Sequence, residues 1–565
     1  MSSTPPSTTP HTVPARRVHR LPLAGLLALG APADIWYKRA YSVVVAAGLP
    51  NITLLLLGRI DLAMFTMAGS LCALYCHNLP YAARARTLAG VCAGMIGGFA
   101  LALVVAALTD SPYVLIAVGA LMAAVQKGAC DAVRIGPPGQ LILTFISSAT
   151  LFTPSTLGQV PGRVALAAGG AVLAWAVCMA PALVRRHGPE RIAVSRALRA
   201  TAAYVARTRE AGAEHAGGPR GQAAGAIHAA WQSLLATGTR TPVRRDLEHL
   251  LVHAEAALAR PDESDPAVLR DWADRTTGAG PVPRPADAAG TADELAGLAV
   301  ERAYRARSGG ALLRGFRPGS PLLPIMLRSA VGCALAGYVS YALGVGRPYW
   351  AIVTAASIFQ ANITLTWSRG VQRVFGNLVG VGLFVAIAPL SHLNQAALVL
   401  CCLAFNFGAE ALIGRNYWLG TVCVTPMALL ITEFGHFQNT GELALDRVVD
   451  TLVGAAVGIL AAVLVTNRRA TSLIGDALVA TARAQAEADA ALAAPDADPV
   501  TLEGRRRRLT GALVELRNTV DAASGEWWQR ALPQQEVLLA EQAAHRTLAA
   551  TVRRQGLPVP KGAST

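Results

Sequence analysis

Arginine residues occur in matched pairs along the two halves of this 565-residue chain. The pairs are Arg39 with Arg328, Arg59 with Arg347, and Arg86 with Arg373. A guanidinium group is planar, and its fixed fork of N–H donors fits the two oxygens of a carboxylate. Paired arginines that face a common path would therefore favour small organic anions, and all three pairs are candidates for contact with such a ligand.

A simpler interpretation applies to the first and third pairs. Lys and Arg accumulate in the short cytoplasmic links of membrane proteins, whatever those proteins do. Arg59 and Arg347 do not fit this interpretation, because the distribution of basic links described below puts them on the opposite side of a membrane. Contact with an anion would explain them.

Aromatic residues stand close to one of these arginines. Tyr349 and Trp350 follow Arg347 at the start of an apolar run. Their rings could stack on an aromatic ligand, which makes them further candidates for substrate binding. Tyr and Trp also gather at membrane–water interfaces, where their amphipathic rings are stable without a ligand. The sequence leaves both interpretations open.

Two acidic residues are candidates for proton exchange. Glu410 lies inside an apolar run, where an ionisable group is costly and often marks a pathway. Asp450 lies near the start of the last apolar run and shares a helical face with Asp446. The alternatives are a fixed pair between Glu410 and Arg415, and neutralisation of Arg447 by its acidic neighbours.

The composition is that of a membrane protein. Hydrophobic residues make up 53% of the chain and charged residues 15%, whereas a soluble domain carries about 25% charged residues. The formal net charge of +15 lies mainly in links and tails beside apolar segments, which favours membrane orientation over nucleic-acid binding. No phosphate-binding loop, zinc-protease motif or dinucleotide fingerprint occurs in a fitting context. We therefore expect no enzyme activity, no cofactor and no metal.

The elements that must position these residues are apolar segments in two groups of six. Residues 37–185 hold segments near 39–57, 60–77, 87–108, 113–127, 139–154 and 163–184. Residues 322–466 hold segments near 326–345, 349–365, 371–389, 395–413, 416–433 and 447–465. Several are short for a span of about 20 residues. The sequence predicts an all-α polytopic membrane protein with about 12 transmembrane helices.

The two groups share landmarks at a nearly constant distance. The three arginine pairs are separated by 289, 288 and 287 residues, and Arg163 precedes Arg447 by 284. Gly170 and Gly454 follow those last two arginines by seven residues. Recurrence at a fixed period indicates an internal repeat. An even number of spans in each copy makes the copies parallel, so we expect two parallel six-helix units.

The stretches PYWAIVTAASIFQ and RGVQRVFGNLVG, within residues 348–380, resemble the core signature of the fusaric acid resistance protein family of bacterial membrane transporters. The resemblance covers roughly residues 328–465. The first half resembles the family weakly, because Asp61 and Leu62 stand where the second half has Tyr349 and Trp350. The family includes aromatic carboxylic acid exporters and is distantly similar to plant aluminium-activated malate channels. The resemblance, and not the residue pattern, implies aromatic carboxylates as substrates.

Basic links give the expected orientation. Links near residues 77–86 and 127–138 carry Lys or Arg, whereas those at 109–112 and 154–162 carry none. Positive links lie inside, so both termini should be cytoplasmic. We expect a disordered tail at 1–36, a cytoplasmic helical domain at 186–321 with a loop at 262–290, and a C-terminal helical region at 467–565, with helices near 470–493, 499–523 and 532–553. The link 433–446 should be external.

These observations favour an inner-membrane exporter of small organic anions that is driven by a gradient. An anion channel is the first alternative, and a continuous basic path without an essential acid would favour it. A membrane scaffold that transports nothing is the second. The sequence leaves open whether a homo-oligomer or an accessory protein completes the path, and it gives no sign of a nucleic-acid partner.

Overall fold

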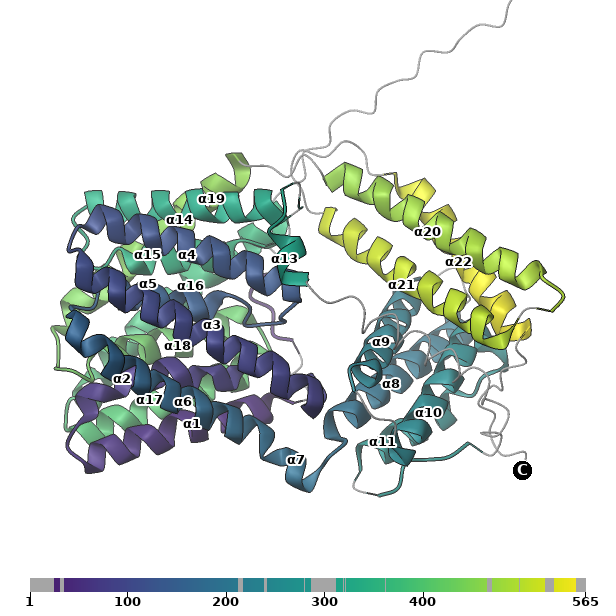
Figure 1. Ribbon diagram of the computed structural model, residues 1–565, viewed down its shortest axis with the longest axis horizontal. Helices are drawn as coiled ribbons and strands as arrows, with labels where there is room; N and C mark the ends of the chain where they lie inside the picture. The colour runs from purple at the N-terminus through teal and green to yellow at the C-terminus, as the bar shows by residue number, and fades with distance from the viewer. Residues whose placement is uncertain are drawn as a thin grey trace, which may run out of the picture.

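The computed structural model describes residues 25–554, apart from 31–34, 212–216, 238–240, 279, 286–310, 319, 321, 361, 465–469, 497 and 524–532. Every regular element in this described part is a helix. A bundle of apolar helices lies beside a smaller helical region (Figure 1). Of the tail expected at 1–36, residues 1–24 and 31–34 lie outside the described residues.

Residues 36–184 form the first group of apolar helices. They are α1 (Trp36–Leu56), α2 (Ala63–Ser70) with the 3-10 turns η1 (Ile60–Leu62) and η2 (Leu71–Leu74) on either side, α3 (Tyr81–Leu108), α4 (Pro112–Val133), α5 (Leu141–Leu151), η3 (Leu157–Gln159), α6 (Val160–Met179) and α7 (Pro181–Val184). The second group follows a short helix, α13 (Ala311–Gly315). It consists of α14 (Leu322–Ala342), α15 (Tyr349–Ile358), α16 (Ile363–Ser391), α17 (Gln395–Ile413), α18 (Tyr417–Thr432) and α19 (Thr440–Leu464).

Eight of these helical segments are long and apolar enough to cross a membrane, and four are shorter. The short ones are Ile60–Leu74, Leu141–Leu151, Tyr349–Ile358 and Tyr417–Thr432. They are the second and the fifth segment of each group. Ten residues of α helix, the length of α15, rise about 15 Å, which is half of a hydrocarbon core about 30 Å thick. Such a helix must end inside the bundle, where neighbouring helices shield its terminal backbone groups.

Two predicted links lie partly within long helices instead. Arg369, between the predicted segments 349–365 and 371–389, lies within α16, and Arg86 lies within α3. The start of α16 is fixed by Asn362, whose side-chain oxygen accepts a hydrogen bond from Leu365 N at 2.8 Å. No proline interrupts residues 363–373, so the backbone hydrogen bonds continue through the basic stretch. The link predicted at 433–446 also ends earlier than expected, because α19 begins at Thr440 and contains Asp446 and Arg447.

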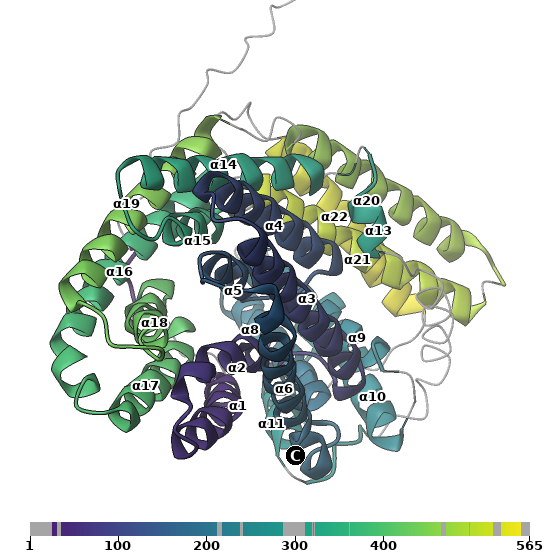
Figure 2. The same ribbon diagram turned by 60° about the vertical axis from the view of Figure 1, so that its left-hand side comes forward.

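The packing inside one group recurs in the other. In the first group α2 packs on α6, and α3 packs on α5 and α6. In the second group α15 packs on α19, and α16 packs on α18 and α19. Between the groups α1 contacts α17, and α4 contacts α14 (Figure 2). These contacts are reciprocal, because the first helix of each group meets the fourth helix of the other.

Glycines allow the short helices to approach their neighbours closely. A Cβ atom added to Gly170 would lie 2.2 Å from the carbonyl oxygen of Thr66, and one added to Gly454 would lie 2.6 Å from that of Ala351. Gly170 and Gly454 are the glycines that the sequence pairs, and the Cβ added to Gly454 would also lie 2.8 Å from Thr354 Cβ. Small residues at such crossings let helix backbones touch.

Gly454→Ala should lower the stability of the protein by about 1–3 kcal/mol, because the new methyl group meets backbone and forces α15 and α19 apart. Gly97→Ala is the matched control. A Cβ at Gly97, in α3, meets nothing within 4 Å, and alanine favours a helix over glycine by up to about 1 kcal/mol. Thermal unfolding of the purified variants measures both effects. An unchanged midpoint for Gly454→Ala would contradict this packing.

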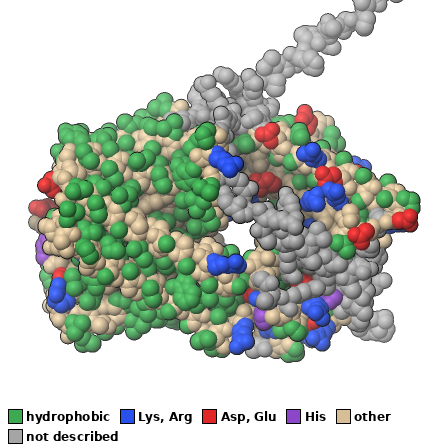
Figure 3. Space-filling model, viewed as in Figure 1, with side chains coloured by type: hydrophobic (Ala, Val, Ile, Leu, Met, Phe, Trp, Pro, Cys, Tyr) green, Lys and Arg blue, Asp and Glu red, His purple; other side chains and the backbone are tan. Residues whose placement is uncertain are grey.

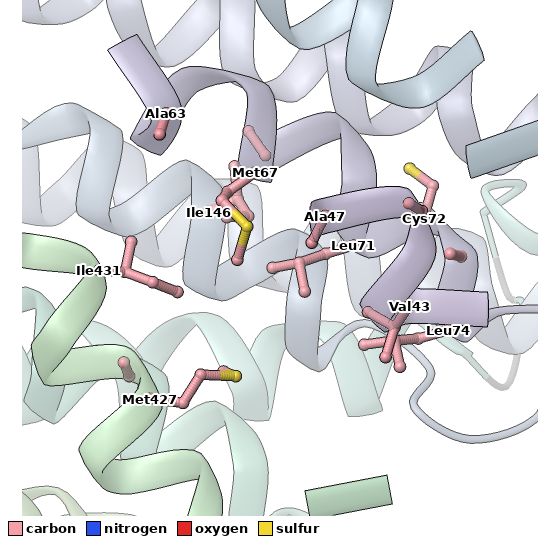
Figure 4. Packing of buried hydrophobic residues seen from close by; sticks show 14 of the residues in the cluster. Val43, Ala47, Ala63, Met67, Leu71, Cys72, Leu74, Ile146, Met427 and Ile431 are labelled. Atoms are coloured by element: carbon pink, nitrogen blue, oxygen red, sulfur yellow. The ribbon is translucent and has the colours of Figure 1, made fainter. Parts of the chain in front are cut away.

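The centre of the bundle is filled by apolar side chains from both groups. Met427 and Ile431 of α18 point toward Met67, Leu71 and Ile146 of the first group (Figure 4). Met67 and Leu71 are both 1% exposed. On the outside of the bundle, hydrophobic side chains cover the face shown in Figure 3, whereas charged side chains gather at its ends and over the helical region. An apolar exterior of this kind suits a lipid environment.

Two sets of helices form the helical region beside the bundle. The middle set contains α8 (Gly188–Ala211), α9 (Gly217–Leu235), α10 (Pro242–Ala259) and α11 (Pro266–Thr277). The prediction of a loop at 262–290 is therefore wrong over Pro266–Thr277, which form α11. Asp265 caps the N-terminus of this helix. The C-terminal set contains α20 (Ala470–Ala493), α21 (Pro499–Ala523) and α22 (Gln534–Arg554), close to the helices predicted there.

The two sets pack together around buried charges. Helix α21 contacts α9, and α22 contacts α10. Arg506 of α21 is buried and pairs with Glu255 of α10 and Glu503 of its own helix, each at 2.7 Å. Burial alone would lower the pKa of Arg506, but these two carboxylates raise it above its ordinary value. The guanidinium group therefore stays charged and joins the sets.

Candidate anion site in the second group of helices

A buried arginine lies at the meeting point of three helices. Arg447 of α19 is 1% exposed. Its Nε donates a hydrogen bond to Asn377 Oδ1 at 3.1 Å, and its Cζ lies 4.0 Å from the centre of the Trp350 ring. Its Nη1 is buried and has no hydrogen-bond partner among the described residues. The site thus contains a strong donor that is positioned but not satisfied.

A second buried arginine lies on the neighbouring helix. Arg373 of α16 is 3% exposed, and its Nη1 donates to the hydroxyl of Tyr417 at 3.1 Å. Its Nε is another buried donor without a hydrogen-bond partner in the described part of the chain. Arg369, one turn earlier, places its Cζ 3.6 Å from the centre of the Tyr417 ring. The guanidinium groups of Arg373 and Arg447 are near enough to act on each other electrostatically.

Asn377 connects the two arginines. Its Nδ2 donates to the backbone oxygen of Arg373 at 3.0 Å, and its Oδ1 accepts from Arg447 and also from Thr425 Oγ1 at 2.7 Å. Asn377 is 1% exposed. The Asn377 amide therefore holds the Arg447 guanidinium, while Thr425 and the backbone of Arg373 fix the amide itself. We refer to Arg373, Asn377, Tyr417, Thr425, Arg447 and Asp450 as the polar cluster.

One carboxylate belongs to this cluster. Asp450 lies about one turn after Arg447, is fully buried, and accepts a hydrogen bond from the Ser340 hydroxyl of α14. Its other oxygen, Oδ2, has no hydrogen-bond partner among the described residues. The cluster therefore buries two cations against one anion. Buried charge is costly unless it is paired, so the arrangement favours an additional anion.

Polar contacts continue from the cluster toward the end of the bundle away from the helical region. Arg347, which precedes α15, donates to Asp446 Oδ2 at 2.9 Å and also to the side-chain oxygen of Gln438. Asp446 lies one turn before Asp450 on α19. Arg347 and Asp446 are both partly exposed, at 27% and 23% of their side chains. They form a polar end to the same helix interface.

Tyr349 and Trp350 lie inside the protein rather than at a membrane interface. They are 6% and 1% exposed. Trp350 stacks on Phe145 of α5 with ring centres 5.6 Å apart, and Tyr349 lies 5.8 Å from Phe152. Because Arg447 also contacts the Trp350 ring, this indole separates the polar cluster from the first group of helices.

The other arginines predicted from sequence lie elsewhere. Arg59 is exposed and pairs with Asp61 at 3.1 Å. Arg328 is buried, donates to the backbone oxygen of Gln360 at 3.0 Å, and lies over the Phe359 ring. Arg86, the counterpart of Arg373, is exposed on α3. The structure therefore brings Arg373, Trp350 and Asp450 together, and leaves Arg59 and Arg328 outside the polar cluster.

Glu410 belongs to a different interface. It lies on α17, which packs against α1 of the first group. It makes no hydrogen bond or ion pair with a described residue, and the charge that acts on it is that of Arg39 on α1. The two predicted acidic residues therefore occupy separate places, one beside Arg447 and one between the two groups of helices.

Sequence reasoning assigned no role to Asn377 and gave Arg447 only a structural one. A signal for Asn377 was present. Arg369, Arg373 and Asn377 recur at every fourth residue, a spacing that puts them on one face of a helix. The predicted link around Arg369 hid this pattern, because a helix was expected only from residue 371. Among the described residues no group of three or more His, Cys, Asp or Glu side chains could hold a metal ion.

Comparison with known proteins places these observations in a family context. Residues 335–461 match the model of the fusaric acid resistance protein-like family, and this range includes every member of the polar cluster. The uncharacterized membrane protein YvaC of Bacillus subtilis is 25% identical over 533 residues, which cover 87% of this chain and 81% of that protein. No solved structure matches the chain.

Two further relatives match only a short region. The inner membrane protein YccS of Escherichia coli is 31% identical over 152 residues, covering 26% of this chain and 20% of that protein. The uncharacterized protein slr1298 of Synechocystis is 26% identical over 144 residues, covering 26% and 19%. The chain thus spans about a fifth of each of these two relatives. This chain is a multi-pass membrane protein, and its residues 335–461 are similar to the fusaric acid resistance protein-like family.

Proposed function

We propose that this protein transports small organic anions across the membrane, and that the polar cluster of the second group binds them. The observation that carries the proposal is the buried guanidinium of Arg447, whose Nη1 has no hydrogen-bond partner among the described residues. A carboxylate there would satisfy this donor and balance the second buried arginine. The family resemblance adds aromatic carboxylates as the substrate class.

Each predicted residue has a place in this proposal. Trp350 holds the Arg447 guanidinium beside the bound carboxylate through its ring face, and Tyr349 supports it from the neighbouring position. Arg373 receives the anion from the side of the helical region. Arg347 marks the opposite end, where Asp446 competes with an anion for its guanidinium. The remaining arginines, Arg39, Arg59 and Arg328, attract anions at the helix ends without touching the bound one.

The two groups of helices are proposed to be parallel six-helix repeats that move against each other. Three features support the proposal: the short segments occupy the same places in both groups, the helix contacts recur, and the contacts between the groups are reciprocal. The centre between the groups is closed by apolar side chains. Passage therefore requires the groups to separate, which favours alternating access over an open channel.

Two acidic residues are proposed to couple transport to a proton gradient. Asp450 lies beside the anion site, so its charge and a bound carboxylate compete for Arg447. Glu410 lies between the groups, near Arg39, where protonation would weaken an attraction that holds α1 and α17 together. Together they provide one proton site at the substrate and one at the moving interface.

Orientation follows from the helical region. We propose that this region and both termini are cytoplasmic, because basic residues gather on its side of the bundle. A cysteine placed at Arg275, an exposed residue of α11, in a protein without other cysteines should resist an impermeant thiol reagent in intact cells and react after lysis. Reaction in intact cells would reverse the orientation.

Flux in proteoliposomes tests the proposed function. Purified protein should release benzoate and related carboxylates faster than protein-free liposomes, and an imposed pH gradient should increase the rate. Carboxylate release at the protein-free rate would contradict transport and leave a scaffold role. Release that ignores the pH gradient would favour the channel alternative.

A further inference from the structure

A cavity of about 230 Å³ lies in the helical region, between α9, α21 and α22. Arg220, Arg517 and His545 line it from three different helices. A smaller pocket of about 30 Å³ shares Arg220 and His545 and extends to the buried pair Arg506–Glu255. The cavity therefore lies between the helices that follow the first group and those that follow the second, well apart from the polar cluster.

Arg220 is the unusual residue in this cavity. Its Nε is buried and has no hydrogen-bond partner among the described residues. Neighbouring arginines are compensated: Arg506 pairs with Glu255 at 2.7 Å, and Arg517 pairs with Glu541 at 3.1 Å. The cavity consequently contains one cation whose charge no described carboxylate balances. A buried donor of this kind costs free energy until a ligand or water satisfies it.

His545 adds a neutral donor to the same wall. It makes no hydrogen bond with a described residue. Burial, and to a lesser extent the nearby charge of Arg220, together lower the pKa of His545 to about 3. The imidazole is therefore neutral near pH 7 and carries one N–H group, which suits a hydrogen bond to an oxyanion without a second positive charge.

The rest of the cavity is apolar and has free space. Ala224, Leu513 and Leu538 contribute apolar surface. Gly221 and Gly225 lie one turn apart on α9, and a Cβ atom at either would meet nothing within 4 Å. An occupant with a compact apolar body therefore fits better than a bare inorganic ion.

We propose that this cavity binds a small organic monoanion, a carboxylate with a compact apolar body. The single charge follows from the count of charged groups, since Glu541 balances Arg517 and only Arg220 is left. A bound carboxylate would accept from Arg220 and His545, and would join α9 to α21 and α22. The site lies outside the apolar bundle, so the proposal stands whether or not the polar cluster transports anions.

Calorimetric titration of the full-length protein in detergent, with benzoate as the probe, tests this proposal. Arg220→Gln should weaken binding by about 10- to 100-fold, since a hydrogen bond to a charged group contributes about 1.5–3 kcal/mol. Gly225→Leu should abolish binding by filling the cavity, while the protein stays folded because α9 gains a helix-favouring residue. Arg199→Gln, which alters an exposed pair with Asp274, is the control and should bind as the wild type does.

Two further titrations identify the site and the ligand class. Arg447→Gln should leave a benzoate-binding step that Arg220→Gln weakens, because the two arginines belong to separate sites. Inorganic phosphate should bind more weakly than benzoate, because it has no apolar body. Benzoate binding that survives both Arg220→Gln and Gly225→Leu would overturn the site, and phosphate binding as tight as benzoate would overturn the organic ligand.

Discussion

Arg447→Gln is expected to reduce carboxylate flux in proteoliposomes by about 10- to 100-fold, the factor that corresponds to a lost hydrogen bond between charged groups. Glutamine fills similar space but offers no charge and no guanidinium fork. The loss should appear for every carboxylate tested, because Arg447 contacts the acid group and not the body of the substrate. Initial rates at several substrate concentrations measure it.

Two variants separate this effect from damage to the fold. Arg447→Lys keeps the buried positive charge near Asp450 and should insert normally, yet recover flux only in part, because an ammonium lacks the bidentate fork. Arg163→Gln changes the matching arginine of the first group. The Arg163 Nη1 already donates to the Ser155 hydroxyl and to the backbone oxygen of Pro154. The Arg163→Gln variant should therefore transport carboxylate at nearly the wild-type rate. Equal flux in Arg447→Gln and wild type would remove Arg447 from the site.

Glu410→Gln is expected to abolish the response of flux to a pH gradient while exchange of substrate across the membrane continues. The amide has nearly the shape of the acid but neither binds nor releases a proton. Asp450→Asn should have the same effect and should also change the apparent affinity for the anion, since Asp450 lies beside Arg447. Gradient-driven uptake and substrate exchange, measured on the same preparation, separate the two effects.

Glu442→Gln is the matched control for these two variants, because Glu442 is exposed in the first turn of α19. It should respond to the gradient as the wild type does. Normal gradient-driven flux in Glu410→Gln would remove Glu410 from coupling. A channel would show altered conductance at most.

Hydrophobic runs predicted the helices well, and for a physical reason. An apolar run in lipid must form helix because its backbone groups find no other partners. Residues 395–413 were predicted with the bounds that the structure has. The helix starts near Arg86 and Arg369 were placed too late, because polarity was taken as the end of a helix. Without a proline the backbone hydrogen bonds continue through charged residues.

The candidate site was only partly predictable. Arg373, Trp350 and Asp450 were singled out from sequence; Arg373 and Asp450 belong to the polar cluster, and Trp350 contacts its Arg447. Their grouping around Arg447 depends on how α15, α16 and α19 cross, which is set by the close contact at Gly454 and not by any local pattern. The position of Trp350 could not be deduced either, since a tryptophan at a helix start suits a membrane interface and a buried stack equally well. Only the contact with Phe145, 205 residues earlier in the chain, decides between them.

The most direct measurement is the position of a bound carboxylate. A crystal of the protein with 4-bromobenzoate, recorded at the bromine absorption edge, locates the ligand by its anomalous signal. The account predicts a peak between α15, α16 and α19, with the carboxylate against Arg447 Nη1 and the ring beside Trp350, and the loss of that peak in Arg447→Gln. Two results would contradict an anion site at the polar cluster. One is an anomalous peak in the bundle that persists in Arg447→Gln, and the other is a bromine signal confined to the helical region.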